Sequence, residues 1–245
     1  MYRKSNKIII VGATSGIGYE VAQLFCRAGW KVGIAGRRGD KLEEFKATVS
    51  SEVETECIDV THPDATFHLQ SLIDRMGGMD IFFLSSGVGS QNYSLQPAIE
   101  LQTIETNAAG FTRMVTFAWN FFKQQKGGHI AVISSIAGTK GLGAAPAYSA
   151  TKRFQNTYID ALEQLAYMEK LPICFTDIRP GFVRTALLKD KHYPLLMKPE
   201  RVAATIQTAL LKKKRRVVID WRYRILVFFW RLVPACIWKR LPIRN

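Results

Sequence analysis

Tyr148 and Lys152 stand four positions apart in the run Tyr-Ser-Ala-Thr-Lys, and these two side chains are suited to moving a proton. On a helix, residues at this spacing share a face, so the ammonium group would lie beside the phenol. A phenol with a pKa of about 10 exchanges protons poorly at neutral pH, and a nearby positive charge favours its ionised form. We therefore expect Lys152, together with a second positive charge brought beside the phenol by a bound molecule, to move the pKa of Tyr148 towards the range of a general acid or base.

A glycine-rich turn occupies residues 12–18, in the run Gly-Ala-Thr-Ser-Gly-Ile-Gly. It follows an apolar run at residues 7–11, which predicts a buried strand, and precedes a helical pattern. Glycine is needed where a turn is tight and where the backbone approaches a pyrophosphate, and a helix N-terminus offers free N–H groups to phosphates. We expect the phosphates of a dinucleotide to be bound by Gly12, Thr14, Ser15, Gly16, Ile17 and Gly18.

Arg37 and Arg38 follow the second apolar run, at the place where NAD-selective sites keep an acid for the ribose 2′-hydroxyl. No acid lies between this run and Asp40. A guanidinium pairs with a 2′-phosphate through two hydrogen bonds, whereas a carboxylate repels it. Two solvated loop arginines are the alternative. The position at the end of a strand favours NADP(H) as the cofactor.

Strand and helix patterns alternate along the chain, with glycine at many of the boundaries. This alternation predicts an α/β fold, a doubly wound parallel sheet of the Rossmann type with about seven strands and helices on both faces. We expect a single catalytic domain over residues 1–220, followed by a basic and apolar helical extension over residues 221–245. The expected strands are residues 7–11, 31–35, 56–58, 81–84, 130–133, 173–178 and 217–219, and the main helices are residues 17–28, 40–49, 101–125, 148–170 and 199–212.

The glycine spacing Gly-x3-Gly-x-Gly, the Tyr-x-x-x-Lys pair and a later Pro-Gly motif follow one another in a familiar order. In this the chain resembles the short-chain dehydrogenase/reductase family over about residues 6–220. The resemblance implies that Ser135, thirteen residues before Tyr148, orients and polarises the substrate oxygen, with Ser134 as the alternative. It also implies cofactor contacts at Asp59, Val60, Gly87, Pro180, Gly181, Val183 and Thr185, besides Tyr148 and Lys152.

Asn107, in the run Glu-Thr-Asn-Ala-Ala-Gly, matches an asparagine that holds a water in the family's proton relay from Lys152. An asparagine that bonds helix backbone is the alternative. Two positions depart from the family pattern. Val11 stands where the family usually has threonine, and Leu-Ser-Ser-Gly at residues 84–87 replaces Asn-Asn-Ala-Gly. The second departure concerns the geometry beside the adenine ribose rather than the catalytic residues.

The resemblance implies hydride transfer between nicotinamide and a carbonyl or secondary alcohol, and so an NADP(H)-dependent oxidoreductase. A non-catalytic NADP(H)-sensing protein on the same fold is the alternative, and the intact Asn107, Ser135, Tyr148 and Lys152 set argues against it. Sugar-nucleotide epimerases also use Tyr-x-x-x-Lys, but the glycine spacing disfavours them. Leu142, Phe182 and the short loop 186–198 suggest an open, apolar pocket, and therefore an apolar or lipid-like substrate.

The helix expected at residues 101–125 carries more apolar residues than one face of a sheet needs. The family resemblance implies that this helix and the one bearing Tyr148 form a four-helix interface between subunits. We therefore expect a homodimer or a homotetramer. The apolar residues on which this expectation depends are Phe111, Met114, Val115, Ala118, Trp119 and Phe122.

Composition narrows the remaining possibilities. The four cysteines are scattered without a Cys-x-x-Cys pair, and the four histidines show no ligand spacing, so we expect reduced thiols and no metal site. The beginning of the chain lacks the apolar run of a signal peptide, which favours a cytoplasmic protein. The net charge is +14, of which +10 falls from residue 212 onward. A basic segment on a near-neutral domain indicates an anionic partner.

The extension combines those charges with three tryptophans, Trp221, Trp230 and Trp238. An apolar arc edged by Arg224 and Arg231 indicates a helix that lies on anionic lipid, because the apolar stretch 225–238 is too short to span a bilayer. We expect residues 221–241 to hold the protein on a membrane surface, and we expect no nucleic acid partner. An arm packed on its own or a partner subunit is the alternative.

Overall fold

The computed structural model describes residues 6–186, 188 and 193–243. Its strands form a single parallel sheet in the order β3-β2-β1-β4-β5-β6-β7, which confirms the predicted fold class. The expected strand at residues 56–58 begins three residues earlier, at Val53, because its register is set by pairing with β2. The strands are β1 (Lys7–Val11), β2 (Lys31–Gly36), β3 (Val53–Cys57), β4 (Ile81–Leu84), β5 (Gly128–Ile133), β6 (Ile173–Arg179) and β7 (Arg216–Val218).

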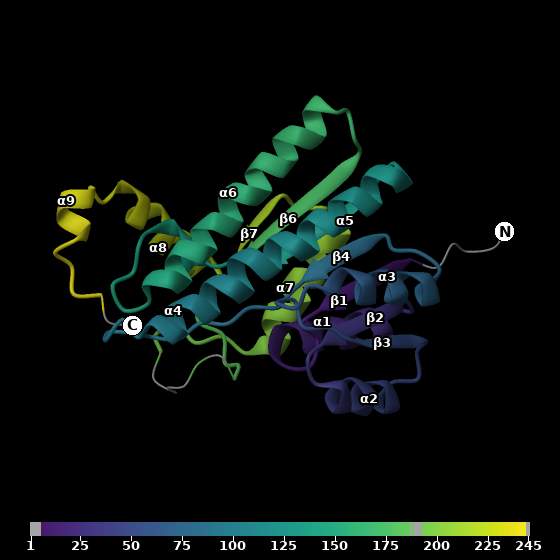
Figure 1. Ribbon diagram of the computed structural model, residues 1–245. Coiled ribbons are helices and arrows are strands. Elements are labelled where there is room, and N and C mark those ends of the chain that lie inside the picture. Colours follow the sequence, from purple (N-terminus) through teal and green to yellow (C-terminus); the bar gives the residue numbers. More distant parts are fainter. Residues whose placement is uncertain (1–5, 187, 189–192, 244–245) are drawn as a thin grey trace.

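Helices cover both faces of this sheet, as Figure 1 shows. Successive side chains of a strand point to opposite faces, so Ile8 and Ile10 of β1 belong to one buried cluster, and Ile9 and Val11 to the other. The first cluster lies under α1 (Gly16–Arg27), α2 (Gly39–Thr48) and α7 (Pro199–Leu211), and the second under α3 (Ala65–Met76), α5 (Phe111–Gln125) and α6 (Pro146–Met168).

The sheet order reverses between β1 and β4, which pair with each other although two strands separate them in the sequence. In a doubly wound sheet, the loops at the carboxyl ends of such neighbouring strands diverge and leave a crevice that binds ligands. The turn after β1, the loop after β4 and the residues after β5 all lie at this edge. The topology therefore brings the glycine turn and Ser135 to the same crevice.

The single helix expected over residues 101–125 is interrupted in the structure. The segment consists of α4 (Pro97–Ile104), a π-helical turn η1 (Glu105–Gly110) and then α5, all with right-handed backbone. A π turn is wider than an α turn and often marks a functional position. Here a Cβ on Gly110 would lie 2.9 Å from the carbonyl oxygen of Val60, so the turn packs against the loop after β3.

The reasoning that led to a subunit interface on α5 is wrong in one respect. The six apolar residues that were thought to exceed the needs of the sheet are all buried within this chain, so they are not available to a partner. They fill the second core cluster together with residues of α3 and α6. The large apolar side chains exposed on α3, α4 and α6 are instead Phe67, Leu101, Ile104, Phe154, Tyr167 and Met168. An oligomer remains a prediction, with different contacts.

The C-terminal extension packs on the domain rather than standing apart from it. Helix α8 (Trp221–Leu232) buries Tyr223 and Val227 in the first core cluster, and a short helix α9 (Ala235–Trp238) follows it. The break between them lies at Pro234, which has no N–H to continue the first helix. No helix in the described part of the chain is long and apolar enough to cross a membrane.

The basic residues near the C-terminus are divided between two ends of the molecule. Residues 212–215 precede β7 and so lie at the amino ends of the parallel strands, where Arg215 pairs with Asp160 and Glu163. Helix α8 follows β7 and lies at the carboxyl ends, beside the beginning of α6 in Figure 1. The charge of +10 therefore does not form a single surface.

Candidate active site

A cavity of about 1250 Å³ opens at the carboxyl ends of the strands. Nearly every residue predicted to bind the cofactor or to act in catalysis lines it. Two do not: Gly18 and Asn107 stand behind the lining. The predicted residues that line the cavity are Gly12, Thr14, Ser15, Gly16, Ile17, Arg37, Arg38, Asp59, Val60, Gly87, Ser135, Tyr148, Lys152, Pro180, Gly181, Val183 and Thr185.

The glycine turn has the close approaches that a phosphate cradle requires. Gly12 has φ of +95°, and a Cβ there would lie 2.5 Å from the backbone nitrogen of Ser86. A Cβ on Gly18 would lie 2.2 Å from the carbonyl oxygen of Gly12, so this glycine lets α1 pack against the turn. The backbone N–H groups of Ser85 and Ser86 donate to the carbonyl of Val11 at 2.8 and 3.1 Å. The unusual sequence at residues 84–87 thus keeps an ordered loop beside the turn.

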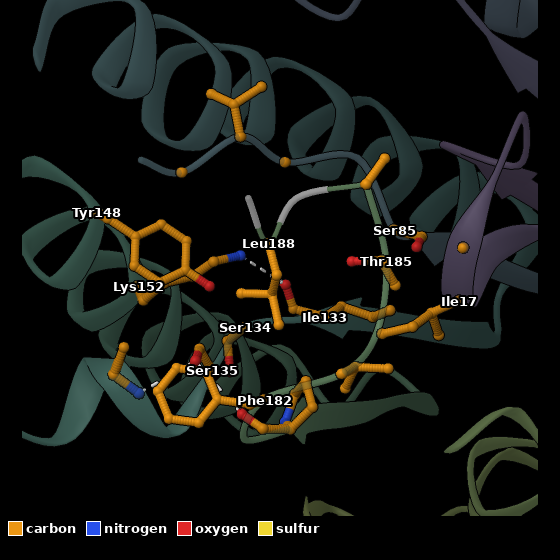
Figure 2. Close-up of a pocket in the computed structure, with 18 of the residues that line it drawn as sticks. Ile17, Ser85, Ile133, Ser134, Ser135, Tyr148, Lys152, Phe182, Thr185 and Leu188 are labelled. Atoms are coloured by element: carbon orange, nitrogen blue, oxygen red, sulfur yellow. Dashed lines mark hydrogen bonds between the residues drawn. The ribbon is translucent and has the colours of Figure 1, made fainter. Parts of the chain in front are cut away.

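Tyr148 and Lys152 project from the first turns of α6 toward the residues that follow β5, as Figure 2 shows. Ser134 donates its hydroxyl hydrogen to the buried carboxylate of Asp177. Ser135 instead shares a side-chain hydrogen bond with Tyr148, and its oxygen accepts from the N–H of Ala137 at 3.1 Å. The structure therefore favours Ser135 over Ser134 as the partner of Tyr148.

Among the groups of the protein itself, burial and Ser135 rather than Lys152 set the direction of the pKa shift of Tyr148. Burial raises the pKa of Tyr148, and the hydrogen bond with Ser135 lowers it by less. The ammonium nitrogen of Lys152 lies 5.7 Å from the centroid of the phenol ring and donates to the carbonyl of Ile133 at 3.0 Å. Burial also lowers the pKa of Lys152 to about 8, against a smaller opposing effect of Asp177. The lowered pKa was predicted for Tyr148 beside both Lys152 and the positive nicotinamide ring, so the raised pKa found for the protein's own groups leaves that prediction standing.

Asn107 lies in the π turn η1 and is completely buried. Its amide nitrogen donates to the carbonyl of Val88 at 2.6 Å, and its side-chain oxygen accepts from the N–H of Val88 at 2.9 Å. The side chain thus holds the loop after β4, rather than the helix backbone that the alternative interpretation expected. Asn107 and Lys152 both border Gly87, where a Cβ would lie 3.3 Å from the Asn107 oxygen and 3.5 Å from the Lys152 nitrogen.

Gln155 was missed by sequence reasoning and connects these groups. Its side-chain oxygen accepts from the ammonium group of Lys152 at 3.0 Å, and its amide nitrogen donates to the carbonyl of Asn107 at 2.9 Å. It lies three residues after Lys152 on α6 and is buried. That spacing was the available signal, but only the packing of α6 against η1 shows what the amide touches.

The two arginines after β2 lie at the rim of the cavity. The guanidinium of Arg38 donates to the hydroxyls of Thr14 at 2.7 Å and Ser15 at 2.8 Å, so its charge lies over the glycine turn. Burial raises the pKa of Asp59, but hydrogen bonds from Thr61 and the charge of Arg37 outweigh it, and the net pKa is lowered. Arg37 therefore acts on the loop that follows β3.

The C-terminal extension forms part of the cavity wall, which the sequence did not predict. Tyr223, Leu226 and Trp230 of α8 line it together with the expected Leu142 and Phe182. The Tyr223 hydroxyl accepts from the N–H of Phe182 at 3.1 Å and donates to the carbonyl of Pro194 at 3.0 Å. In the predicted substrate loop 186–198, Leu187 and residues 189–192 lie outside the described residues. The described loop residues Leu188 and Tyr193 also line the cavity.

Within residues 6–186, 188 and 193–243, no three His, Cys, Asp or Glu side chains gather as a possible set of metal ligands. Buried His129 hydrogen-bonds Thr176 at 2.8 Å, and burial lowers its pKa to about 4. The polar groups that line the cavity include the phenol of Tyr148, the ammonium group of Lys152 and the hydroxyl of Ser135.

Comparison with known sequences gives the same class of protein. The short chain dehydrogenase family profile matches residues 6–194. An oxidoreductase of Listeria monocytogenes is 33% identical over 227 residues, covering 84% of this chain and 91% of that protein. Dehydrogenase/reductase SDR family member 7B of Bos taurus is 27% identical over 269 residues, covering 99% of this chain and 82% of that protein.

Solved structures share the fold. An alcohol dehydrogenase from Thermococcus sibiricus, complexed with 5-hydroxy-NADP, superposes with a TM-score of 0.79 at 21% identity, covering 88% of this chain and 96% of that chain. A 3-ketoacyl-ACP reductase from Sinorhizobium meliloti superposes with a TM-score of 0.76 at 25% identity, covering 87% and 97%.

Fold and family together define a dehydrogenase or reductase of the α/β type, a class that uses a nicotinamide cofactor. The chain belongs to the short chain dehydrogenase family. The alternative of a non-catalytic cofactor sensor is not favoured by these relatives, which are oxidoreductases.

Proposed function

We propose that the protein is an NADP(H)-dependent oxidoreductase that interconverts a carbonyl compound and a secondary alcohol of apolar or lipid-like character. The observation that carries the proposal is the convergence of Ser135, Tyr148 and Lys152 on one cavity with the glycine turn. Bound nicotinamide would supply or accept the hydride. The residues of the chain would then hold the substrate oxygen and move the proton.

Tyr148 would exchange a proton with the substrate oxygen, and Ser135 would hold that oxygen through its hydroxyl. Because its pKa is about 8, Lys152 carries its proton at neutral pH. Its ammonium group has three donors, and bonds to Ile133 and Gln155 account for two of them within the described residues. The third is suited to a ribose hydroxyl of the cofactor. Asn107 and Gln155 would act as positioning residues through Val88 and Lys152.

A direct test compares Tyr148→Phe with the wild type, using NADPH and a panel of apolar ketones at the NADPH absorbance. Turnover should fall by several orders of magnitude, since general acid–base catalysis alone contributes about 10²–10⁴-fold. NADPH binding should persist, because the substitution leaves the glycine turn intact. A variant that turns over within about tenfold of the wild type would remove Tyr148 from the proton path.

NADP(H) selectivity rests on Arg37 and Arg38, with the Arg38 guanidinium already over Thr14 and Ser15. One pairing with a 2′-phosphate is worth about 1.5–3 kcal/mol, so NADPH should bind at least about tenfold more tightly than NADH. Arg38→Met should abolish most of this preference and leave NADH binding unchanged. Arg27→Met, an exposed arginine on α1 that bonds only Gln23 among the described residues, is the matched control. Equal affinities in the wild type would refute the assignment.

Apolar residues from three segments, the loops after β5 and β6 and helix α8, line the cavity, which supports an apolar substrate. They are Leu142, Phe182, Leu188, Leu226 and Trp230. The homodimer or homotetramer, the cytoplasmic location and the attachment of residues 221–241 to an anionic membrane surface also belong to this proposal. The two faces of α8 show which residues would make the membrane attachment.

A further inference from the structure

Helix α8 has two apolar faces with different surroundings. On the inner face, Tyr223 and Val227 are buried, and Leu226 and Trp230 line the cavity. The outer face carries five large apolar side chains that contact little of the protein, and we call it the outer α8 patch. Their exposed fractions are 66% for Trp221, 49% for Ile225, 60% for Phe228, 59% for Phe229 and 63% for Leu232.

The outer α8 patch is a continuous stripe rather than scattered exposure. Trp221, Ile225, Phe228 and Leu232 follow one another at intervals of three or four residues, and Phe229 adjoins Phe228, so all five share one side of the helix. Single exposed apolar residues are ordinary, but a contiguous group of aromatic and aliphatic side chains marks an interaction surface. Two further apolar side chains are exposed beyond α8: Ile237 in α9 and Leu241 after it.

The charges around the outer α8 patch decide what kind of partner it fits. Residues 221–243 contain five arginines and lysines and no acidic residue. Arg222 forms an ion pair with Asp220 at 2.7 Å. Arg231, Lys239 and Arg240 are exposed, and no carboxylate in the described residues pairs with them. A second copy of the same patch would bring like charges together, whereas an anionic surface would satisfy them.

The extension is fixed to the rim of the cavity by specific contacts. Lys140 donates from its ammonium group to the carbonyl of Val233 at 2.9 Å, and the indole N–H of Trp238 donates to the carbonyl of Gly141 at 2.8 Å. Leu142, the next residue of that loop, lines the cavity. A surface that binds the outer α8 patch would therefore lie next to the substrate side of the cavity.

We propose that the outer α8 patch docks on the surface of an anionic lipid bilayer, so that the cavity receives an apolar substrate from the lipid. An amphipathic helix edged by arginine and tryptophan, and too short to cross a membrane, has the composition of an interfacial helix. Lipid docking is independent of the chemistry, but delivery of a substrate rests on the proposed reductase function. Trp230 and Leu226 are then the residues that an incoming substrate meets on the inner face of α8.

The test is sedimentation of the full chain with vesicles made of equal parts phosphatidylcholine and phosphatidylglycerol, or of phosphatidylcholine alone. The variant Phe228→Glu/Phe229→Glu adds two negative charges to the outer α8 patch without touching a buried residue. Phe67→Glu/Tyr167→Glu changes two exposed aromatic residues on α3 and α6 and is the matched control. Truncation after Asp220 is unsuitable, because it would remove Tyr223 and Val227 from the core.

We expect the wild type and the control to bind the anionic vesicles, with part of the binding surviving high salt, and to bind neutral vesicles weakly. The outer patch variant should bind at least about tenfold less, since both its apolar and its charge contributions are reduced. Its melting temperature and light-scattering mass should match those of the control. Wild-type protein that stays in solution at low salt would overturn the proposal. So would a variant that binds as well as the wild type, or one whose main change is loss of an oligomer.

Activity separates this proposal from the proposed function. In the absence of vesicles, the outer patch variant should reduce a water-soluble ketone with NADPH at the wild-type rate, because its substitutions lie outside the cavity. With an apolar ketone dissolved in anionic vesicles, it should lose at least about tenfold in rate relative to the control. Vesicle binding without turnover of any ketone would overturn the reductase assignment and the delivery step, while the docking surface would be upheld.

Discussion

Tyr223→Phe isolates a single hydroxyl that joins α8 to the wall of the cavity. The hydroxyl accepts from the N–H of Phe182 at 3.1 Å and donates to the carbonyl of Pro194 at 3.0 Å. Removing it creates almost no cavity, and the ring keeps its place over Gly181, where a Cβ would lie 2.2 Å from the ring. The cost is therefore that of losing part-buried hydrogen bonds to a half-buried N–H and to the carbonyl of an exposed residue, about 1 kcal/mol.

For a domain of this size, 1 kcal/mol changes the melting temperature by about 2–4 °C, so the expected loss is about 2–4 °C. Differential scanning calorimetry measures it directly, and Tyr167→Phe on the exposed side of α6 is the control. Because Phe182 lines the substrate side of the cavity, KM for an apolar ketone should rise while NADPH affinity stays the same. A melting temperature equal to that of Tyr167→Phe would refute the claim that this hydroxyl fastens α8 to the site.

Three further predictions concern the cofactor turn, the buried lysine and assembly. Gly18→Ala should abolish cofactor binding, because its Cβ would lie 2.2 Å from the carbonyl oxygen of Gly12, whereas Gly39→Ala, with nothing within 4 Å, should bind normally in the same titration. Burial holds the pKa of Lys152 at about 8, below its ordinary 10.5, so the folded state loses this proton at a lower pH than the unfolded state. Below pH 8 the folded state bears the full cost of burying the charged ammonium group of Lys152, and this cost disappears as the pH rises through 10.5. The free energy of unfolding of the wild type should therefore increase by about 3 kcal/mol over that range, and that of Lys152→Met should not. Urea titrations at several pH values give these slopes, and Gln155→Leu, which removes an acceptor from the ammonium group, should extend the window to lower pH. Light scattering should give a multiple of 27.6 kDa, and a mass equal to the single chain at micromolar concentration would contradict the oligomer.

The sequence by itself determined the fold class and a set of site residues, most of which line the cavity. The fold class and the glycine turn depend on local patterns: apolar runs and helical periods specify the elements, and glycine at residues 12, 16 and 18 is demanded by the turn itself. The four-residue spacing of Tyr148 and Lys152 survives in any α-helix, so it too could be read without coordinates. The thirteen-residue interval to Tyr148 already favoured Ser135 over Ser134, and the tertiary structure adds the reason that the Ser134 hydroxyl is engaged by Asp177 on β6.

Tertiary structure decided the features that depend on contacts between distant segments. The π turn at Asn107 arises where the segment packs against Val60 and α6, and no local signal distinguishes it from continuous helix. Burial, which a sequence does not reveal, raises the pKa of Tyr148 by more than the hydrogen bond with Ser135 lowers it. Helix α8 reads from sequence as one apolar arc. In the folded protein that arc is divided into two faces. The side chains that contact the first core cluster or line the cavity form the inner face, and the outer α8 patch stays exposed.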